Sequence, residues 1–260
     1  MTNLTLVQLE PFGVIVNAGN ASDDLYNVPL TDLLDLTFKN HVTVIRGFAP
    51  LIGNALPEFC GRLGELLEWD FGTVNELRTS PDARNYLYTN REVPFHWDGA
   101  FVGRVPRFIF FHCDIAPGKG TGGQTLFSDT TMILGLADQK TIETWNKIDI
   151  TYETEKIVHY DGTFRSRIID IDPVFGRKVI RFAEPVNDLN PVRLEISGIP
   201  QTQHDSFLND MHRRLYDKKV CYSHEWQDGD ILIADNHVLL HGRRAFDNDT
   251  ERLIRRVNVL

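Results

Sequence analysis

Short apolar segments separated by turn residues recur through the middle and the end of the chain. Runs of four to eight apolar or β-branched residues, bounded by glycine, proline or asparagine, are typical of β-strands. The sequence Phe175-Gly176-Arg177 predicts a hairpin turn between two of these runs. The pattern predicts strands at residues 12–16, 41–46, 107–114, 124–127, 148–155, 168–172, 178–182, 221–226, 230–234 and 253–259.

Helical spacing of apolar residues is confined to the start of the chain and to a few later segments. It predicts helices over residues 32–40, 57–67, 140–147 and 202–217, the first capped by Thr31. Ser128 or Asp129 is expected to cap a further helix that runs to Ala137. No repeat or polar linker interrupts the chain, so we expect one domain over residues 1–260. Many short strands with helical insertions predict a mainly β fold, a barrel or a double sheet.

Composition narrows the class of protein. The formal charge of −9 disfavours a nucleic-acid partner, which requires a basic face. No run of 18 apolar residues is present, so no membrane span is expected. The three cysteines form no Cys-x-x-Cys pair, and no basic segment followed by an apolar stretch opens the chain. These features favour a cytoplasmic protein with reduced thiols, and they leave a homodimer as an open alternative to a monomer.

The sequence His96-Trp97-Asp98 carries the candidate chemistry. If residues 93–101 are extended, His96 and Asp98 point to the same face. With His241 as a third ligand they form the two-histidine, one-carboxylate set that leaves open iron positions for a co-substrate and O₂. His237 is the rival for the third position. A second pair, at residues 112 and 114, follows an apolar run and is interpreted as a hydrogen-bonded strand end.

Several separate motifs together resemble the taurine/2,4-D dioxygenase (TauD/TfdA) family. They are HWD at 96–98, GGQTLFSD at 122–129, DNHVLLHGRRAF at 235–246 and arginines at 252 and 256. The resemblance implies an iron(II)- and 2-oxoglutarate-dependent enzyme with a double-stranded β-helix, the jelly-roll or cupin-like core.

The same resemblance implies roles for single residues. His96, Asp98 and His241 would bind iron, and Thr125 and Arg252 would bind 2-oxoglutarate. The planar guanidinium of an arginine matches a carboxylate through two parallel hydrogen bonds. Arg256 would then bind an anionic group of the substrate. Thr125 as an ordinary strand residue and Arg256 as a surface cation are the plain alternatives.

A narrower resemblance links the chain to enzymes of isonitrile biosynthesis. It rests on WDFGTVNEL (69–77), VPFHWDGAF (93–101), FHCDIAPG (111–118), RFAEP (181–185) and IADNHVLLHGRRAF (233–246). It implies oxidative desaturation of tyrosine isonitrile, a small carboxylate that an upstream isonitrile synthase supplies. Trp69, Phe71 and Phe101 are then candidates for an aromatic substrate pocket. Whether the alkene keeps the carboxylate or loses it as CO₂ is left open.

Three other functions are compatible with the same metal ligands. A hydroxylase of a small anionic substrate would leave an added oxygen in its product. A non-catalytic, cupin-like metal or ligand sensor would need the three metal ligands but no productive pair of Thr125 and Arg252. A zinc hydrolase also keeps an open metal position, but it has no use for a 2-oxo acid. Release of succinate separates the dioxygenase from the last two.

Overall fold

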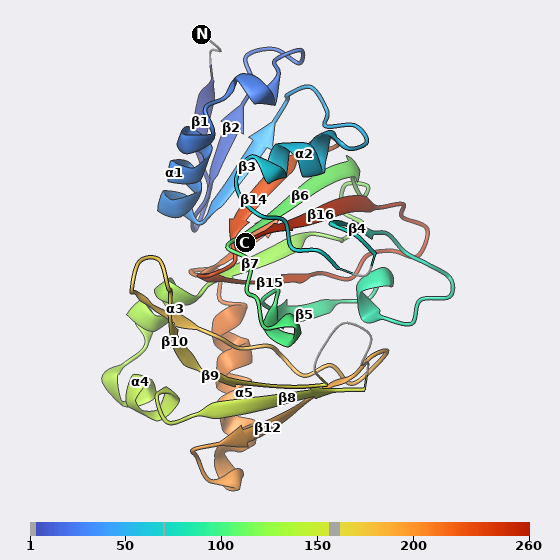
Figure 1. Cartoon of the computed structure of the whole chain (residues 1–260). Coiled ribbons are helices and arrows are strands. Elements are labelled where there is room, and N and C mark those ends of the chain that lie inside the picture. Colours follow the sequence, from blue (N-terminus) through green and yellow to red (C-terminus); the bar gives the residue numbers. More distant parts are fainter. Residues whose placement is uncertain (1–3, 70, 156–161) are drawn as a thin grey trace.

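Two β-sheets form the centre of the computed structural model, which describes residues 4–69, 71–155 and 162–260 (Figure 1). Within these residues the larger sheet has the strand order β1-β2-β3-β14-β6-β16-β4, and the smaller has the order β13-β7-β15-β5. The strands of the larger sheet are β1 (Thr5–Gln8), β2 (Val14–Asn17), β3 (Val42–Arg46), β4 (Val74–Leu77), β6 (Phe108–Ile115), β14 (Ile231–Asp235) and β16 (Leu253–Val259). Those of the smaller sheet are β5 (Val93–His96), β7 (Thr125–Asp129), β13 (Cys221–His224) and β15 (Leu239–Arg243).

Alternation of side chains along the central strands builds two cores from one sheet. On β6, Phe108 and Phe110 pack on the outer side, whereas Ile109 and Phe111 pack on the inner side. The inner side meets Phe127 of β7, so that core lies between the two sheets. From β4 to β7 and from β13 to β16, successive strands alternate between the two sheets.

Two helices cover the outer face of the larger sheet. They are α1 (Leu30–Asn40) and α2 (Ala55–Gly61), whose buried residues join the outer core. The predicted cap at Thr31 is wrong, because the helix already begins after Pro29 and Thr31 lies in its first turn. The helix expected at residues 57–67 ends at Gly61, and Leu67 instead donates its backbone N–H to the carbonyl of Asn258 in β16 at 2.8 Å.

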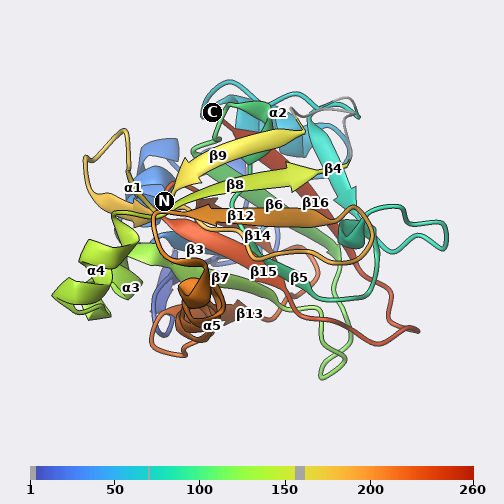
Figure 2. The same cartoon turned by 90° about the horizontal axis from the view of Figure 1, so that it is seen from below.

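A large insertion between β7 and β13 packs against the smaller sheet. It contains α3 (Thr130–Leu136), α4 (Gln139–Trp145), the β10–β11 hairpin (Ile169–Ile171 and Lys178–Ile180) and α5 (His204–Leu215). A three-stranded sheet in the order β12-β8-β9 completes it, with β8 (Asp149–Thr154), β9 (Thr163–Arg167) and β12 (Val192–Ser197). Seen from below, these strands cross in front of the two larger sheets (Figure 2).

Local signals in this insertion agree with the prediction. The carboxylate of Asp129 accepts hydrogen bonds from the backbone of Thr131 and Met132, so it caps α3 as expected. The turn at residues 175–177 joins β10 to β11.

Short 3₁₀ helices occupy Leu25–Asn27, Tyr86–Tyr88, Ala100–Val102 and Gln201–Gln203. The predicted mainly β class with helical insertions is confirmed. None of the helices in the described residues is long and apolar enough to cross a membrane.

Candidate metal centre and adjoining pockets

The two candidate histidine ligands lie opposite each other on neighbouring strands of the smaller sheet. His96 ends β5 and pairs in antiparallel register with His241 of β15, and their ring centroids are 4.3 Å apart. The Nδ1 atom of His96 lies 2.9 Å from the carbonyl oxygen of Pro94. If Nδ1 carries the proton and donates it there, Nε2 is left as a neutral ligand atom.

Asp98 completes the group from a turn. The strand ends at His96, so the expectation of an extended segment through residue 101 is wrong. Gly99 adopts a φ of +97°, and a Cβ at this position would collide with the Arg104 carbonyl oxygen. The turn still brings Asp98 Oδ1 to 3.8 Å from His96 Nε2 and 3.7 Å from His241 Nε2. One ligand atom from each residue lies within 4.8 Å of the others, as a metal site requires.

Three further residues hold Asp98. The side chain of Asn236 accepts a hydrogen bond from the Asp98 backbone N–H at 3.0 Å and donates one to its carbonyl at 3.1 Å. Arg256 donates to the carboxylate at 3.1 Å, and Asn258 donates to Oδ2 at 2.8 Å. Burial alone would raise the pKa of the Asp98 carboxyl, but the positive charge of Arg256, the histidines and Asn258 outweigh it and hold the pKa at about 2. The carboxylate is therefore ionised and fixed.

The electrostatics of the histidines also suit a cation. Burial lowers the pKa of His96 and lowers that of His241 well below the ordinary value. Both rings are therefore neutral near pH 7. The buried Nε2 atom of His241 has no hydrogen-bond partner among the described residues. The group therefore offers two neutral imidazoles and one ionised carboxylate, and the His241 nitrogen is available as a ligand. This set of ligands fits iron(II).

A cavity beside the metal group contains the predicted co-substrate residues. His96, His241, Thr125, Arg252 and Arg256 all contribute to its lining. Arg252 donates through Nε to the carbonyl of Gly123 at 3.2 Å, while its buried NH1 has no partner in the described structure. Burial lowers the pKa of Arg252 to about 9, which leaves it charged at neutral pH. A buried guanidinium without a carboxylate partner fits the distal carboxylate of 2-oxoglutarate.

Arg243 adds a second buried charge at this cavity. Its guanidinium donates to the backbone carbonyls of Leu87, Thr89 and Arg91 at 2.9, 2.6 and 2.7 Å. These bonds hold the segment 87–91 against β15, and Leu87 itself lines the cavity. The sequence analysis did not predict this tether, because the residues that Arg243 contacts are about 150 positions away.

A second pocket also reaches the metal group, because His96 belongs to its lining. Trp69 and Phe101 line it together with His96 and Leu87, so two of the three predicted aromatic residues lie in one pocket. Phe71 stacks on Trp69 with ring centroids 5.9 Å apart, but 47% of its surface is exposed and it does not line the pocket. The remaining lining residues are Asn85, Tyr86, Pro94, Phe95, Trp97, Gly99, Ala100, Val102, Thr154, Ala183, Glu184, Val186, Asn190 and Val192.

The predicted role of Arg256 as a ligand for a substrate anion stays a prediction. The structure places Arg256 in the co-substrate cavity and not in the lining of the second pocket. Its NH1 atom lies 3.1 Å from each oxygen of Asp98. Arg256 is buried, so it is no surface cation.

The other three candidates for metal ligands have partners of their own. His112 and Asp114 both contact Arg255, at 3.1 and 2.7 Å, as expected for a hydrogen-bonded strand end. His237 lies beside Arg107, and burial and that positive charge lower its pKa to about 4.

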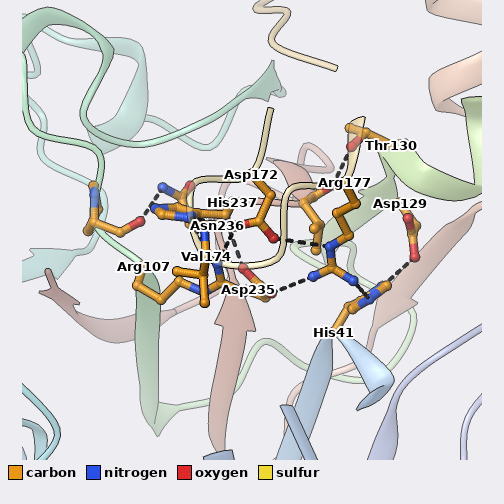
Figure 3. Close-up of polar contacts among 12 residues, drawn as sticks. His41, Arg107, Asp129, Thr130, Asp172, Val174, Arg177, Asp235, Asn236 and His237 are labelled. Carbon is orange, nitrogen blue, oxygen red and sulfur yellow. Dashed lines mark hydrogen bonds and ion pairs between the residues drawn. The ribbon is translucent and has the colours of Figure 1, made fainter. Parts of the chain in front are cut away.

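A buried network of opposite charges lies beside His237. Arg107 and Arg177 share the carboxylates of Asp172 and Asp235, and His41 connects Arg177 to Asp129 (Figure 3). Asn236 follows Asp235 in the chain and reaches from this network to Asp98. Asn236 therefore connects this network to the metal group.

Comparison with known proteins places the chain among dioxygenases. The family model for taurine catabolism dioxygenase TauD, TfdA family, matches residues 9–258. A 3-((Z)-2-isocyanoethenyl)-1H-indole synthase of Fischerella ambigua is 43% identical over 97% of this chain and 94% of its own length. A tyrosine isonitrile desaturase of Pseudomonas aeruginosa is 34% identical over 95% of this chain and 87% of its own. The crystal structure of PvcB from Pseudomonas aeruginosa superposes with a TM-score of 0.84 and 32% identity, covering 99% of this chain and 91% of PvcB. The match confirms the predicted jelly-roll core.

Proposed function

The chain belongs to the TauD/TfdA family of iron(II)- and 2-oxoglutarate-dependent oxygenases, and from that premise we propose that it converts an aromatic 2-isocyano carboxylic acid into an alkenyl isonitrile. The observation that carries this proposal is a pocket lined by aromatic residues that shares His96 with the co-substrate cavity. The names of the relatives support an isonitrile group in the substrate. One names an indole product and the other a tyrosine-derived substrate. Both an indole and a phenol ring therefore belong to the proposed substrate class.

In this proposal, different residues around the metal group bind the metal, the co-substrate and the substrate. His96, Asp98 and His241 would hold iron(II), and Thr125 and Arg252 would hold the distal carboxylate of 2-oxoglutarate. When bound there, iron, 2-oxoglutarate and O₂ supply a two-electron oxidation that releases succinate and CO₂. Trp69 and Phe101 would pack on the aromatic ring of the substrate and exclude water from the hydrogen that is removed.

We propose that the substrate also loses its carboxylate. The described lining of the aromatic pocket holds one acidic residue, Glu184, and no arginine or lysine. An ionised substrate carboxylate gains no charge partner there, so its departure as CO₂ removes an unfavourable buried charge. The substrate then gives up one benzylic hydrogen, its carboxylate bond electrons form the alkene, and two electrons pass to O₂. One oxygen atom ends in succinate and the other in water. The name of the indole relative likewise describes a vinyl isonitrile.

The test is turnover of both aromatic isonitriles with product masses. We would supply iron(II), 2-oxoglutarate and O₂ with the isonitrile of tryptophan or of tyrosine, each the product of an isonitrile synthase. The expected product is lighter than the free acid form of its substrate by CO₂ and two hydrogens, the benzylic hydrogen and the carboxyl proton, with one succinate per product. A product lighter by two hydrogens alone refutes decarboxylation, and one heavier by an oxygen identifies a hydroxylase. Absence of succinate with either substrate contradicts the proposed reaction.

A further inference from the structure

Trp226 stands behind the predicted co-substrate ligand Thr125. It lies in the loop between β13 and β14 and is buried, with its ring 6.1 Å from that of Phe111 in the core between the sheets. Its indole Nε1–H donates a hydrogen bond to Thr125 Oγ1 at 2.9 Å. Sequence reasoning gave Trp226 no role beyond the end of a strand.

The neighbours of Thr125 restrict the direction in which its hydroxyl can donate a hydrogen bond. A hydroxyl has one proton to donate and two lone pairs, whereas indole and guanidinium groups can only donate. Trp226 occupies one lone pair, and NH2 of Arg252 approaches the same oxygen at 3.5 Å. With donors on its oxygen, Thr125 must aim its own proton at an acceptor, and its side chain lines the co-substrate cavity.

We propose that Trp226 is a positioning residue that makes Thr125 a hydrogen-bond donor to the distal carboxylate of 2-oxoglutarate. A carboxylate only accepts hydrogen bonds, so a hydroxyl held as a donor favours it over an alkyl end, which offers no acceptor. Trp226 thereby tunes affinity for the co-substrate without touching it. This inference rests on the proposed assignment of Thr125 and Arg252.

The experiment measures 2-oxoglutarate binding without turnover. Calorimetric titration of the Mn(II)-loaded protein gives the dissociation constant for wild type, Trp226→Phe, Thr125→Val and the double variant. Phe keeps most of the ring but lacks the N–H, and loss of one buried hydrogen bond predicts a dissociation constant raised about fivefold. In the Thr125→Val background the same change should have no further effect, because the hydroxyl it positions is gone.

Three controls separate positioning from packing. Trp145→Phe alters another buried tryptophan, stacked under Arg214 in a different core, and should leave 2-oxoglutarate binding unchanged. Trp226→His restores a ring N–H donor and should recover part of the affinity, and it also serves if the Phe variant does not fold. The probe 2-oxobutanoate lacks the distal carboxylate, so Trp226→Phe should not weaken its binding.

The outcomes distinguish the positioning role of Trp226 from the assignment of Thr125 and Arg252 to 2-oxoglutarate. A fivefold loss that vanishes without the Thr125 hydroxyl supports the inference. An equal loss in the Thr125→Val background, or an equal loss for 2-oxobutanoate, shows a packing effect and overturns it. Unchanged binding in Trp226→Phe with weakened binding in Thr125→Val also overturns it but keeps the co-substrate site. If neither Thr125→Val nor Arg252→Ala weakens binding, the co-substrate site itself is wrong.

Discussion

Replacing Asn236 with alanine should weaken metal binding as well as the fold. The fully buried amide makes three hydrogen bonds, two to the backbone of Asp98 and one to the carbonyl of Pro106 at 2.9 Å. At about 1 kcal/mol of net stabilisation each, their loss should lower the free energy of unfolding of the metal-free protein by about 3 kcal/mol. The turn that carries Asp98 then loses its support, and loss of a residue that orients a metal ligand typically lowers metal affinity 10- to 100-fold.

The assay separates the two effects of Asn236→Ala. Urea unfolding in the presence of a chelator gives the stability of the metal-free protein, and calorimetry with Mn(II) gives the metal affinity. A tenfold lower affinity corresponds to about 1.4 kcal/mol. The difference in free energy of unfolding between wild type and variant should therefore be larger at a saturating Mn(II) concentration than in the chelator. The matched control is Thr130→Val, which removes a buried hydrogen bond of 2.7 Å to the carbonyl of Val238. Thr130 appears in Figure 3 with Asn236 but does not contact Asp98 in any described interaction.

The control should lose about 1 kcal/mol of stability and keep its metal affinity. If Asn236→Ala is destabilised but binds Mn(II) within twofold of the wild-type affinity, Asn236 serves the fold only. The reasoning that connects the turn to the metal would then be refuted.

Three further changes have separate expected results. Arg252→Ala leaves one carboxylate of 2-oxoglutarate without its charge partner and should raise the dissociation constant about 100-fold by calorimetry; an unchanged value contradicts the assignment. Arg256→Leu should lower Mn(II) affinity about tenfold, since its guanidinium contacts Asp98; if only the KM for the acid substrate rises, Arg256 binds the substrate anion as the sequence predicted. His237 has a pKa of about 4 in the folded protein against an ordinary value of about 6.5. Between pH 6.5 and pH 4 the imidazole therefore gains a proton mainly in the unfolded chain. The free energy of unfolding should fall by about 3 kcal/mol over this range. Urea unfolding of the metal-free protein checks this. His96 and His241 also have lowered pKa values, so His237→Asn should lessen the pH dependence and not abolish it, and an equally steep pH dependence in the variant would exclude His237 as a source.

The metal group was predictable because its signals are local. His96 and Asp98 are two residues apart, and His241 stands in a motif with a recognisable order of residues. The apolar pattern predicted neither of the strands that carry the histidines, β5 at the edge of the smaller sheet and β15 beside it, so the motifs alone identified these two residues. What the pattern did not predict is the turn at Gly99, where a φ of +97° redirects the chain directly after Asp98.

Strands at the periphery escaped prediction for a physical reason. Every residue of β1 is exposed, and β9 alternates between exposed and half-buried residues, so neither shows the apolar signal of a core strand. Their formation depends on pairing with β2 and β8, and that partner is not visible from a single segment. The supporting contacts of the site escaped for a related reason. The bond from Asn258 to Asp98 joins residues 160 positions apart, and only the folded sheet brings them together.

The arrangement of both pockets depends on β15 more than on any other strand described here. It supplies His241, it pairs with β5 so that His96 lies opposite, and it carries Arg243, which holds the carbonyl of Leu87. The register between the strands shifts after His241, so that Arg243 pairs with Val93. His96 and Leu87 each line both the co-substrate cavity and the aromatic pocket, so these two residues form the partition between them. One strand therefore sets both the metal ligands and the wall that separates the co-substrate from the substrate, and a change in its register would disturb both at once.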